Sequence, residues 1–243
     1  MEKITELKPN KGKNLCIEVS REDQWGGKWA RFPIKTHVIT KEDDIGKVCL
    51  QYAKPYLKTD DLLFISERVI AITQGRAFPI KEIHPSFLAK FLSKFVTKSP
   101  YGIGLGSPWT MELAIREAGI LRILLGVLVA AITKPFGIRG LFYKVVGKNI
   151  NAIDGPCHYT LPPYNEYAKL GPLNPDKVAM DLKKLLDCNV VIIDANDLGV
   201  NVLGKSSKEI PNDFCESVFR DNPLGQSNEQ TPLCIVRKVK EEK

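Results

Sequence analysis

The sequence predicts an α+β protein in which mixed sheets are flanked by helices. Three observations support this fold class. Two short apolar runs, residues 62–66 and 190–193, have the length and composition of buried strands. Residues 87–96 place phenylalanine and leucine at helical spacing, which indicates an amphipathic helix between such runs. Residues 175–186 predict a helix with proline in its first turn, and strand 190–193 follows it directly.

Size and composition are those of a globular protein with an ordinary surface. The 243 residues can form one large domain or two small ones. Apolar residues make up 44% and charged residues 26%, and the net charge is +7. No block of like charge with interleaved aromatic residues is present, so nucleic acid is not an expected partner. A basic chain does suit anionic small molecules such as nucleotides.

The six cysteines are scattered and form no CxxC pair, so a zinc site has no support. Most lie in apolar or mixed stretches and are interpreted as buried free thiols in a reducing compartment. The first 14 residues are polar and lysine-rich, unlike a secretory signal. We therefore expect a cytoplasmic protein.

The elements of the N-terminal half follow in order. Residues 1–36 are expected to form an N-terminal extension with one or two edge strands, and 37–243 the main region. The charged residues 41–44, three of them acidic, begin a helix that runs to about Tyr56. Strand 62–66 comes next, and the β-branched, apolar residues 68–73 favour a second strand.

A glycine- and proline-rich, then apolar, segment at 99–140 is expected to be an inserted helical part, which leaves two subdomains possible. Residues 118–132 are nearly all apolar but too few for the roughly 20 that span a bilayer. They are interpreted as a buried or interface helix, with membrane association as the open alternative. The aromatic stripe of 87–96 is expected in the core. Residues 141–146 are a strand candidate.

The C-terminal half ends with a helix at 211–219 and a strand at 233–239. A polar loop, residues 222–232, precedes this strand. Gln226 or Glu229 in this loop would be able to reach a ligand, and the alternative is a solvent-exposed connector.

Two acidic turns carry the strongest chemical signal. Asp194 ends the buried strand, and Asp154 stands before Gly155-Pro156. A carboxylate at the end of a buried strand is rigid and points toward the crevice where ligands bind. Two such carboxylates suit Mg²⁺ with a phosphate-bearing substrate, and Asp197 is a spare ligand. The alternative is that Asp154 and Asp197 only start turns.

Gly75 and Arg76 form a turn that would let the backbone and a guanidinium approach an anion, although an ordinary turn with a solvated arginine fits equally. Other kinds of site lack support. The sequence has neither a GxSxG elbow nor a Walker A motif. Cys157 and His158 are adjacent, which in an extended chain turns their side chains apart.

Three blocks together resemble the coenzyme F420-0:L-glutamate (gamma-glutamyl) ligases. Residues 60–76 are similar to the family's strand pair that ends in a Gly-Arg turn. Ala152-Ile153-Asp154, followed by 170–176, is similar to its acidic turn and proline-started helix. Residues 190–194 are similar to its strand with a terminal aspartate, and the spacing of Asp154 and Asp194 fits the family's two metal-binding aspartates. In addition to these three blocks, residues 214–237 are similar to its last helix, loop and strand.

The resemblance implies a gamma-glutamyl ligase-like fold and a ligase that forms an amide through an acyl phosphate. GTP would be the co-substrate with Mg²⁺ or Mn²⁺, and L-glutamate would be added to a small-molecule carboxylate acceptor by a homodimer. Asp154 and Asp194 take the metal role. Gly75, Arg76, Asn151, Gln226 and Glu229 are expected to contact nucleotide or substrate.

Two alternatives stay open beside the ligase. The chain differs from the family pattern after Asp154, where Gly155-Pro156 replaces Ser-Asn, which makes it a divergent member with an open choice of acceptor. A non-catalytic nucleotide- or metabolite-binding protein that keeps the fold is the first alternative. A membrane-peripheral protein that uses residues 118–132 is the second.

Overall fold

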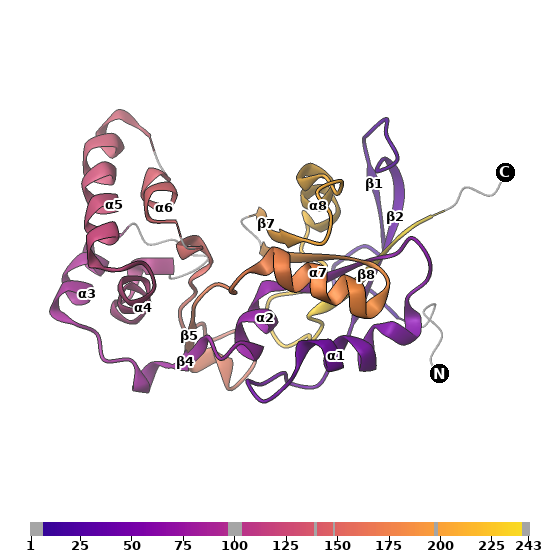
Figure 1. The fold of residues 1–243 in the computed structure, drawn as a ribbon, viewed down its shortest axis with the longest axis horizontal. Coiled ribbons are helices and arrows are strands. Elements are labelled where there is room, and N and C mark those ends of the chain that lie inside the picture. Colours follow the sequence, from indigo (N-terminus) through magenta and orange to yellow (C-terminus); the bar gives the residue numbers. More distant parts are fainter. Residues whose placement is uncertain (1–6, 97–103, 139, 148, 197–198, 240–243) are drawn as a thin grey trace. The chain divides into compact units, whose positions relative to one another are not determined.

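The computed structural model describes residues 7–96, 104–138, 140–147, 149–196 and 199–239 (Figure 1). The chain forms two compact units. Unit 1 comprises Met1–Gln74 and Leu173–Lys243, and unit 2 comprises Gly75–Pro172. Both contain helices and sheet, so the predicted α+β class is confirmed.

Unit 1 is built on a six-stranded mixed sheet in the order β1-β2-β8-β3-β6-β7. At its centre β3 and β6 run parallel, whereas the other neighbouring pairs are antiparallel. Residues 1–36 supply the strands at one side of this sheet. The strands are β1 (Cys16–Val19), β2 (Gly27–Ile34), β3 (Leu62–Ser66), β6 (Asn189–Asn196), β7 (Gly199–Lys205) and β8 (Leu233–Lys238).

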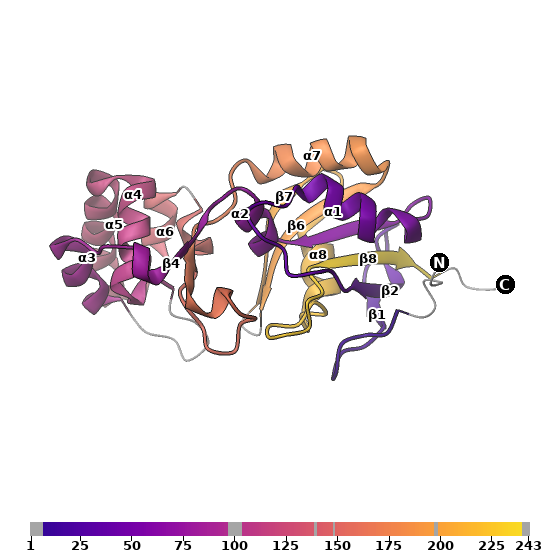
Figure 2. The ribbon, with the colours of Figure 1, turned by 90° about the horizontal axis from the view of Figure 1, so that it is seen from below.

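Helices cover the sheet of unit 1. They are α1 (Ile45–Tyr52), α2 (Glu67–Thr73), α7 (Pro175–Leu186) and α8 (Asn212–Phe219). Successive strand residues point to opposite faces. Phe64, Val191 and Cys234 pack with α8 in one core cluster. Helix α7 contacts β6, β7 and α1, and Figure 2 shows α1 and α7 side by side.

Several predicted elements of unit 1 are confirmed. Strand β3 has the predicted bounds, and α7 begins at Pro175. The Asp44 side chain accepts a hydrogen bond from the backbone N–H of Lys47 and so caps α1, which ends just before the turn containing Pro55. The helix after Pro211 and the strand from Leu233 are present as well.

The prediction of a second strand at 68–73 is wrong, because Glu67–Thr73 is helix α2. Val69, Ile70, Ala71 and Ile72 are all buried. A short apolar run that is buried all around carries no periodicity that separates a helix from a strand. Packing against β3 and β6 decides this case.

Unit 2 combines a small antiparallel sheet with a group of helices. Strands β4 (Ala77–Pro79) and β5 (Tyr167–Lys169) form the sheet. The helices are α3 (Phe87–Leu92), α4 (Pro108–Ala118), α5 (Ile120–Thr133) and α6 (Leu141–Val146). One apolar cluster that includes Leu92, Met111, Ile123 and Val146 holds them together.

Residues 141–146 form a helix, so the predicted strand there is wrong. This helix packs on α5 at Gly126, where an added Cβ would come within 2.5 Å of Val146 Cγ2. The apolar segment that the sequence predicts as one helix is α5 alone. Gly119, with φ of +83°, separates it from α4, since this left-handed conformation interrupts helical geometry.

The expectation that the aromatic stripe of 87–96 lies in the core is also wrong. Phe87, Phe91 and Phe95 are exposed, whereas the small residue Ala89 and Leu92 face inward. Helix α5 is likewise exposed along most of its length, with Ile123 and Gly126 as its buried positions. Of the two readings for this segment, the buried helix is therefore wrong and the interface helix stays a prediction.

Candidate functional site

Two carboxylates come directly after the last residues that pair between the parallel strands β3 and β6. Ser66 pairs with Ile193, and one residue further come Glu67 and Asp194. Glu67 begins α2 and is only 3% exposed, whereas Asp194 is half-buried. The sequence interpretation gave Glu67 no role, although its place directly after a buried strand was a usable signal.

Strand β6 continues beyond the position predicted for its end. Asp194 pairs with Asn201 of β7, and β6 runs to Asn196. Asp194 therefore lies within a hairpin strand and not at a strand terminus. Its position is still the first after the buried run that ends at Ile193. The hairpin explains the difference, because the ladder with β7 holds the backbone extended beyond the fully buried run.

The loop 222–232 reaches the same edge of the sheet. Strand β8 is antiparallel to β3, so its start lies beside the end of β3, and the Ser66 N–H donates to the Pro232 carbonyl at 2.9 Å. Gln226 is half-buried, and its Nε2 makes no hydrogen bond with the described residues. The Glu229 carboxylate accepts from the Ser227 N–H at 2.8 Å. Unit 1 thus brings Asp194 and this predicted ligand-binding loop to one edge.

Asp154 belongs to unit 2, beside a buried lysine. Its backbone pairs with Lys169 through both N–H···O bonds, of 3.1 and 2.9 Å. Lys169 Nζ donates to the Ala152 carbonyl at 2.8 Å and lies 3.7 Å from Asp154 Oδ2. The Asp154 side chain is 43% exposed and that of Lys169 only 4%. Asp154 is therefore fixed by backbone pairing, with an ammonium group beside it that sequence reasoning missed.

Gly75 and Arg76 occupy the start of unit 2. Gly75 has φ of +69°, a left-handed conformation that favours glycine. Arg76 Nε donates to the Gly171 carbonyl at 2.6 Å, and Nη2 lies 3.0 Å from Glu117 Oε1. An anion that binds at Arg76 would therefore share the guanidinium with Glu117.

The remaining predicted residues are placed as follows. Asn151 is exposed in the 3₁₀ turn Ile150–Ala152. Asp197 lies outside the described residues. Asp154 and Asp194 belong to different units, and their binding of one shared ion stays a prediction. Within the described parts of the chain, no group of three or more histidine, cysteine, aspartate or glutamate residues is arranged to hold a metal.

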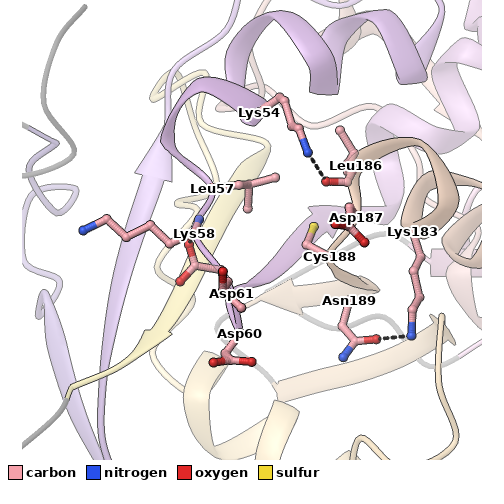
Figure 3. A pocket seen from close by; sticks show the side chains of 11 residues that line it. Lys54, Leu57, Lys58, Asp60, Asp61, Lys183, Leu186, Asp187, Cys188 and Asn189 are labelled. Atoms are coloured by element: carbon pink, nitrogen blue, oxygen red, sulfur yellow. Dashed lines mark hydrogen bonds between the residues drawn. The ribbon is translucent and has the colours of Figure 1, made fainter.

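A cavity of about 440 Å³ opens at the opposite edge of the unit 1 sheet (Figure 3). It lies where β3 and β6 begin, about 16 Å along β6 from Asp194 at 3.3 Å per residue. The polar side chains that line this cavity form hydrogen bonds mainly with other groups of the protein. The Asp61 carboxylate accepts from Arg237 at 2.7 and 2.6 Å, and Lys183 Nζ donates to Asn189 Oδ1 at 2.9 Å.

The cavity also contains Cys188, but this thiol is a poor nucleophile. Burial raises its pKa to about 11 and that of Cys49 to about 12. A thiol with such a pKa stays protonated at neutral pH. Cys49, Cys188, Cys215 and Cys234 are buried and free, as predicted for most of the cysteines. The carboxyl edge with Asp194 and Glu67 is therefore the better candidate for chemistry.

Comparison with protein families identifies the family of this chain. The model of the family described as F420-0:Gamma-glutamyl ligase matches residues 33–205, well over half of the chain. This chain belongs to the F420-0:gamma-glutamyl ligase family. The matched range includes β3, α2, Asp154 and Asp194 of this family member and ends before the loop 222–232. A comparison with curated proteins found no match.

Proposed function

We propose that this member of a ligase family is a metal- and nucleotide-dependent ligase that forms a γ-glutamyl-type amide. L-Glutamate is the added amino acid, GTP the co-substrate, and coenzyme F420-0 the first acceptor to test. The family match across the β3–β6 pair carries the proposal. The carboxylates of Glu67 and Asp194 at the end of this pair support it.

The proposed reaction has two steps. An oxygen of the acceptor carboxylate attacks the γ-phosphorus of GTP, the bond to the β-γ bridging oxygen breaks, and GDP leaves. The amine of L-glutamate then attacks the acyl carbon, the carbon–oxygen bond to phosphate breaks, and phosphate leaves as the amine loses a proton. Positioning and neutralisation of phosphate charge contribute most to such transfers.

The residues present fit a hard divalent cation. Mg²⁺ and Mn²⁺ prefer oxygen ligands, and Mg²⁺ is commonly held by one or two carboxylates together with substrate phosphates. Asp194 would hold the ion, and Glu67, the residue after the last paired position of β3, is a further carboxylate at this end of the pair. A bound ion would neutralise phosphate charge during transfer.

Other side chains have proposed binding roles. Asp154 is proposed as the second metal ligand, and the ammonium group of Lys169 would hold its carboxylate in place. Asp197 is proposed either as a further metal ligand or as a residue that positions a metal ligand. The amide of Gln226 would donate to a ligand oxygen, since its Nε2 has no bond to the described chain.

Four more residues also have proposed binding roles. Gly75, Arg76, Asn151 and Glu229 are proposed to contact nucleotide or substrate. Arg76 would have to share its guanidinium with Glu117, and Glu229 would have to give up its bond to Ser227. We also propose a cytoplasmic homodimer, which sedimentation equilibrium would test for the oligomeric state.

The activity is tested by mass spectrometry with purified protein, GTP, Mg²⁺, L-glutamate and F420-0. The expected result is an acceptor heavier by one glutamyl residue, with one GDP and one phosphate released per amide. Release of GDP without an amide would reject F420-0 as the acceptor. The non-catalytic alternative would be favoured if the protein binds nucleotide but releases neither GDP nor phosphate and forms no amide with any carboxylate acceptor.

The metal role is tested by Mn²⁺ binding in the presence of GTP. Asp194→Asn should weaken Mn²⁺ by at least about tenfold, since loss of even a supporting outer-shell group costs about 10–100-fold. The matched control is Asp181→Asn on the exposed side of α7, which should leave Mn²⁺ binding unchanged. Unchanged affinity in Asp194→Asn, with a native circular dichroism spectrum, would remove Asp194 from the site.

A further inference from the structure

Helix α5 exposes an apolar face that the proposed ligase chemistry does not use. Leu121, Leu124, Leu125, Leu128 and Ile132 are all exposed, Leu121 to 84%. At about 100° per residue these five side chains fall within an arc of roughly 100°. The buried positions Ile123 and Gly126 lie on the opposite side, toward α6. The exposed leucines are therefore a continuous stripe along the helix.

Helix α3 and the turn after it carry a second apolar stripe. Phe87, Phe91 and Phe95 are four residues apart and exposed, Phe87 to 85%. The rings of Phe91 and Phe95 contact each other, with centroids 5.0 Å apart. Lys90 and Lys94 flank them and are exposed. Both α3 and α5 pack on α4, and Figures 1 and 2 show them on the side of the unit 2 helices away from β4 and β5.

The charges around these stripes are strongly one-sided. Residues 87–147 contain eight lysines and arginines and two glutamates. Both glutamates already face a guanidinium in unit 2, Glu112 that of Arg116 and Glu117 that of Arg76, each at 3.0 Å. Among the described residues the basic ones are Lys90, Lys94, Arg116, Arg122, Lys134 and Lys144, and Lys98 and Arg139 lie outside the described ranges. The apolar stripes are thus set in a basic surrounding.

The dimensions favour a helix that lies on a bilayer. Helix α5 has 14 residues, a length of about 21 Å at 1.5 Å per residue, against a hydrocarbon core of about 30 Å. In the described ranges, no helix is long and apolar enough to cross a membrane. Helices with an apolar face and flanking lysines or arginines bind in the plane of the lipid headgroups.

We propose that the helical part of unit 2 docks on an anionic lipid bilayer, with the α5 and α3 stripes inserted among the headgroups and the basic residues facing lipid phosphates. Charge complementarity selects this occupant, because basic residues near a membrane are attracted by anionic lipids. A second copy of the chain fits less well. Twofold pairing would set this face against itself and bring like charges together.

The experiment is co-sedimentation of the full-length protein with vesicles. Vesicles of phosphatidylcholine alone are compared with vesicles that also contain phosphatidylglycerol, at low salt and at about 1 M salt, where the Debye length is about 3 Å. We expect binding to the anionic vesicles at low salt, with a marked reduction on neutral vesicles and at high salt. Equal binding to both vesicle types, or salt-independent binding, would overturn the role of charge and with it the proposal.

Variants test whether the two apolar stripes, and not nonspecific adsorption, are responsible for vesicle binding. Leu121→Ser with Leu125→Ser should weaken binding at least about tenfold, as should Phe91→Ser with Phe87→Ser. Lys90→Gln should weaken it roughly fivefold. These side chains are exposed, so the fold should persist, which circular dichroism checks.

The matched control is Met180→Ser on α7, an exposed apolar residue of unit 1. It should bind vesicles like the unchanged protein. Wild-type binding by the α5 or the α3 variant would overturn the proposal. Absence of vesicle binding by the unchanged protein would overturn it as well. If the unchanged protein binds no vesicles but self-associates, and the α5 variant does not self-associate, a second copy covers this face.

Discussion

Asp221→Asn is expected to destabilise unit 1, because it removes the counter-charge of a fully buried arginine. Arg31 lies in β2 with an exposure of 0%. Its Nη2 donates to Asp221 Oδ2 at 3.0 Å and its Nη1 to Asp221 Oδ1. Nη1 also donates to the Val218 carbonyl at 2.9 Å. The pair therefore links β2 to the end of α8.

The expected loss in the free energy of unfolding follows from how deeply Arg31 and Asp221 are each buried. Removing one partner of a buried ion pair costs about 3–5 kcal/mol, because the other charge stays buried. Two features reduce this figure: the Asp221 side chain is 36% exposed, so water can reach Arg31 from that side, and asparagine keeps one oxygen acceptor. We therefore expect a loss of about 2 kcal/mol in the free energy of unfolding at pH 7.

The pH dependence adds a second signature. Burial alone would raise the pKa of Asp221, but the hydrogen bond and charge of Arg31 outweigh it and hold the pKa below its usual value. A lowered folded-state pKa contributes stability above the unfolded pKa, about 3.9, and this contribution is lost as pH falls through the folded pKa. The difference between the two proteins should be constant near neutral pH and shrink below about pH 4.

The assay is urea unfolding followed by tryptophan fluorescence. Trp25 and Trp29 stack in unit 1 and pack on Phe214 of α8, so they report on this region. Asp213→Asn is the control, since the Asp213 side chain is 68% exposed and such pairs contribute about 0–1 kcal/mol. A loss below about 0.5 kcal/mol in Asp221→Asn would refute the reasoning, because a charge left in the interior costs more than that.

Further predictions concern unit 2 and the thiols. Gly126→Ala should destabilise unit 2 by about 1–3 kcal/mol in thermal unfolding, since its Cβ would come within 2.5 Å of Val146 Cγ2; an unchanged melting temperature would contradict the α5–α6 contact. The native protein should react with a thiol reagent at pH 8 first at the partly exposed Cys16 and Cys157. The four buried cysteines should react only after unfolding, because burial raises their pKa values to about 11 or 12; rapid modification of any of them would contradict this.

Elements with a local signal were predictable. Strand 62–66 is a run of large apolar residues between polar neighbours, and Pro175 fits only the first turn of a helix. Asp44 caps α1 by a bond within its own turn. Such choices depend on residues within a few positions of each other, which the sequence displays directly.

Elements that packing decides were mispredicted. Residues 68–73 and 141–146 are short apolar runs that suit either conformation, and both became helices through packing on other elements, α2 on β3 and β6 and α6 on α5. The phenylalanines of 87–96 had the spacing of a core face, but the core took Ala89 and Leu92 instead. Apolar spacing identifies one face of a helix and leaves open what covers it.

At the candidate site, too, some features had a local sequence signal and others were decided by the tertiary structure. The aspartate after 190–193 was readable because a charge at the end of a buried run is unusual in a strand. Glu67 comes to the same end of the sheet only through the parallel register of β3 and β6, which are more than 100 residues apart. The loop 222–232 joins them because β8 runs antiparallel to β3.

The amino-acid sequence by itself determined the fold class, the buried strands of the central pair and the family, because these depend on local apolar patterns and on short motifs. The tertiary structure alone decided that Glu67 and Asp194 follow the same end of the β3–β6 pair, that Asp221 neutralises Arg31, and that the leucines of α5 face outward. Pairing register and burial are properties of the whole packed chain, and no window of neighbouring residues contains them.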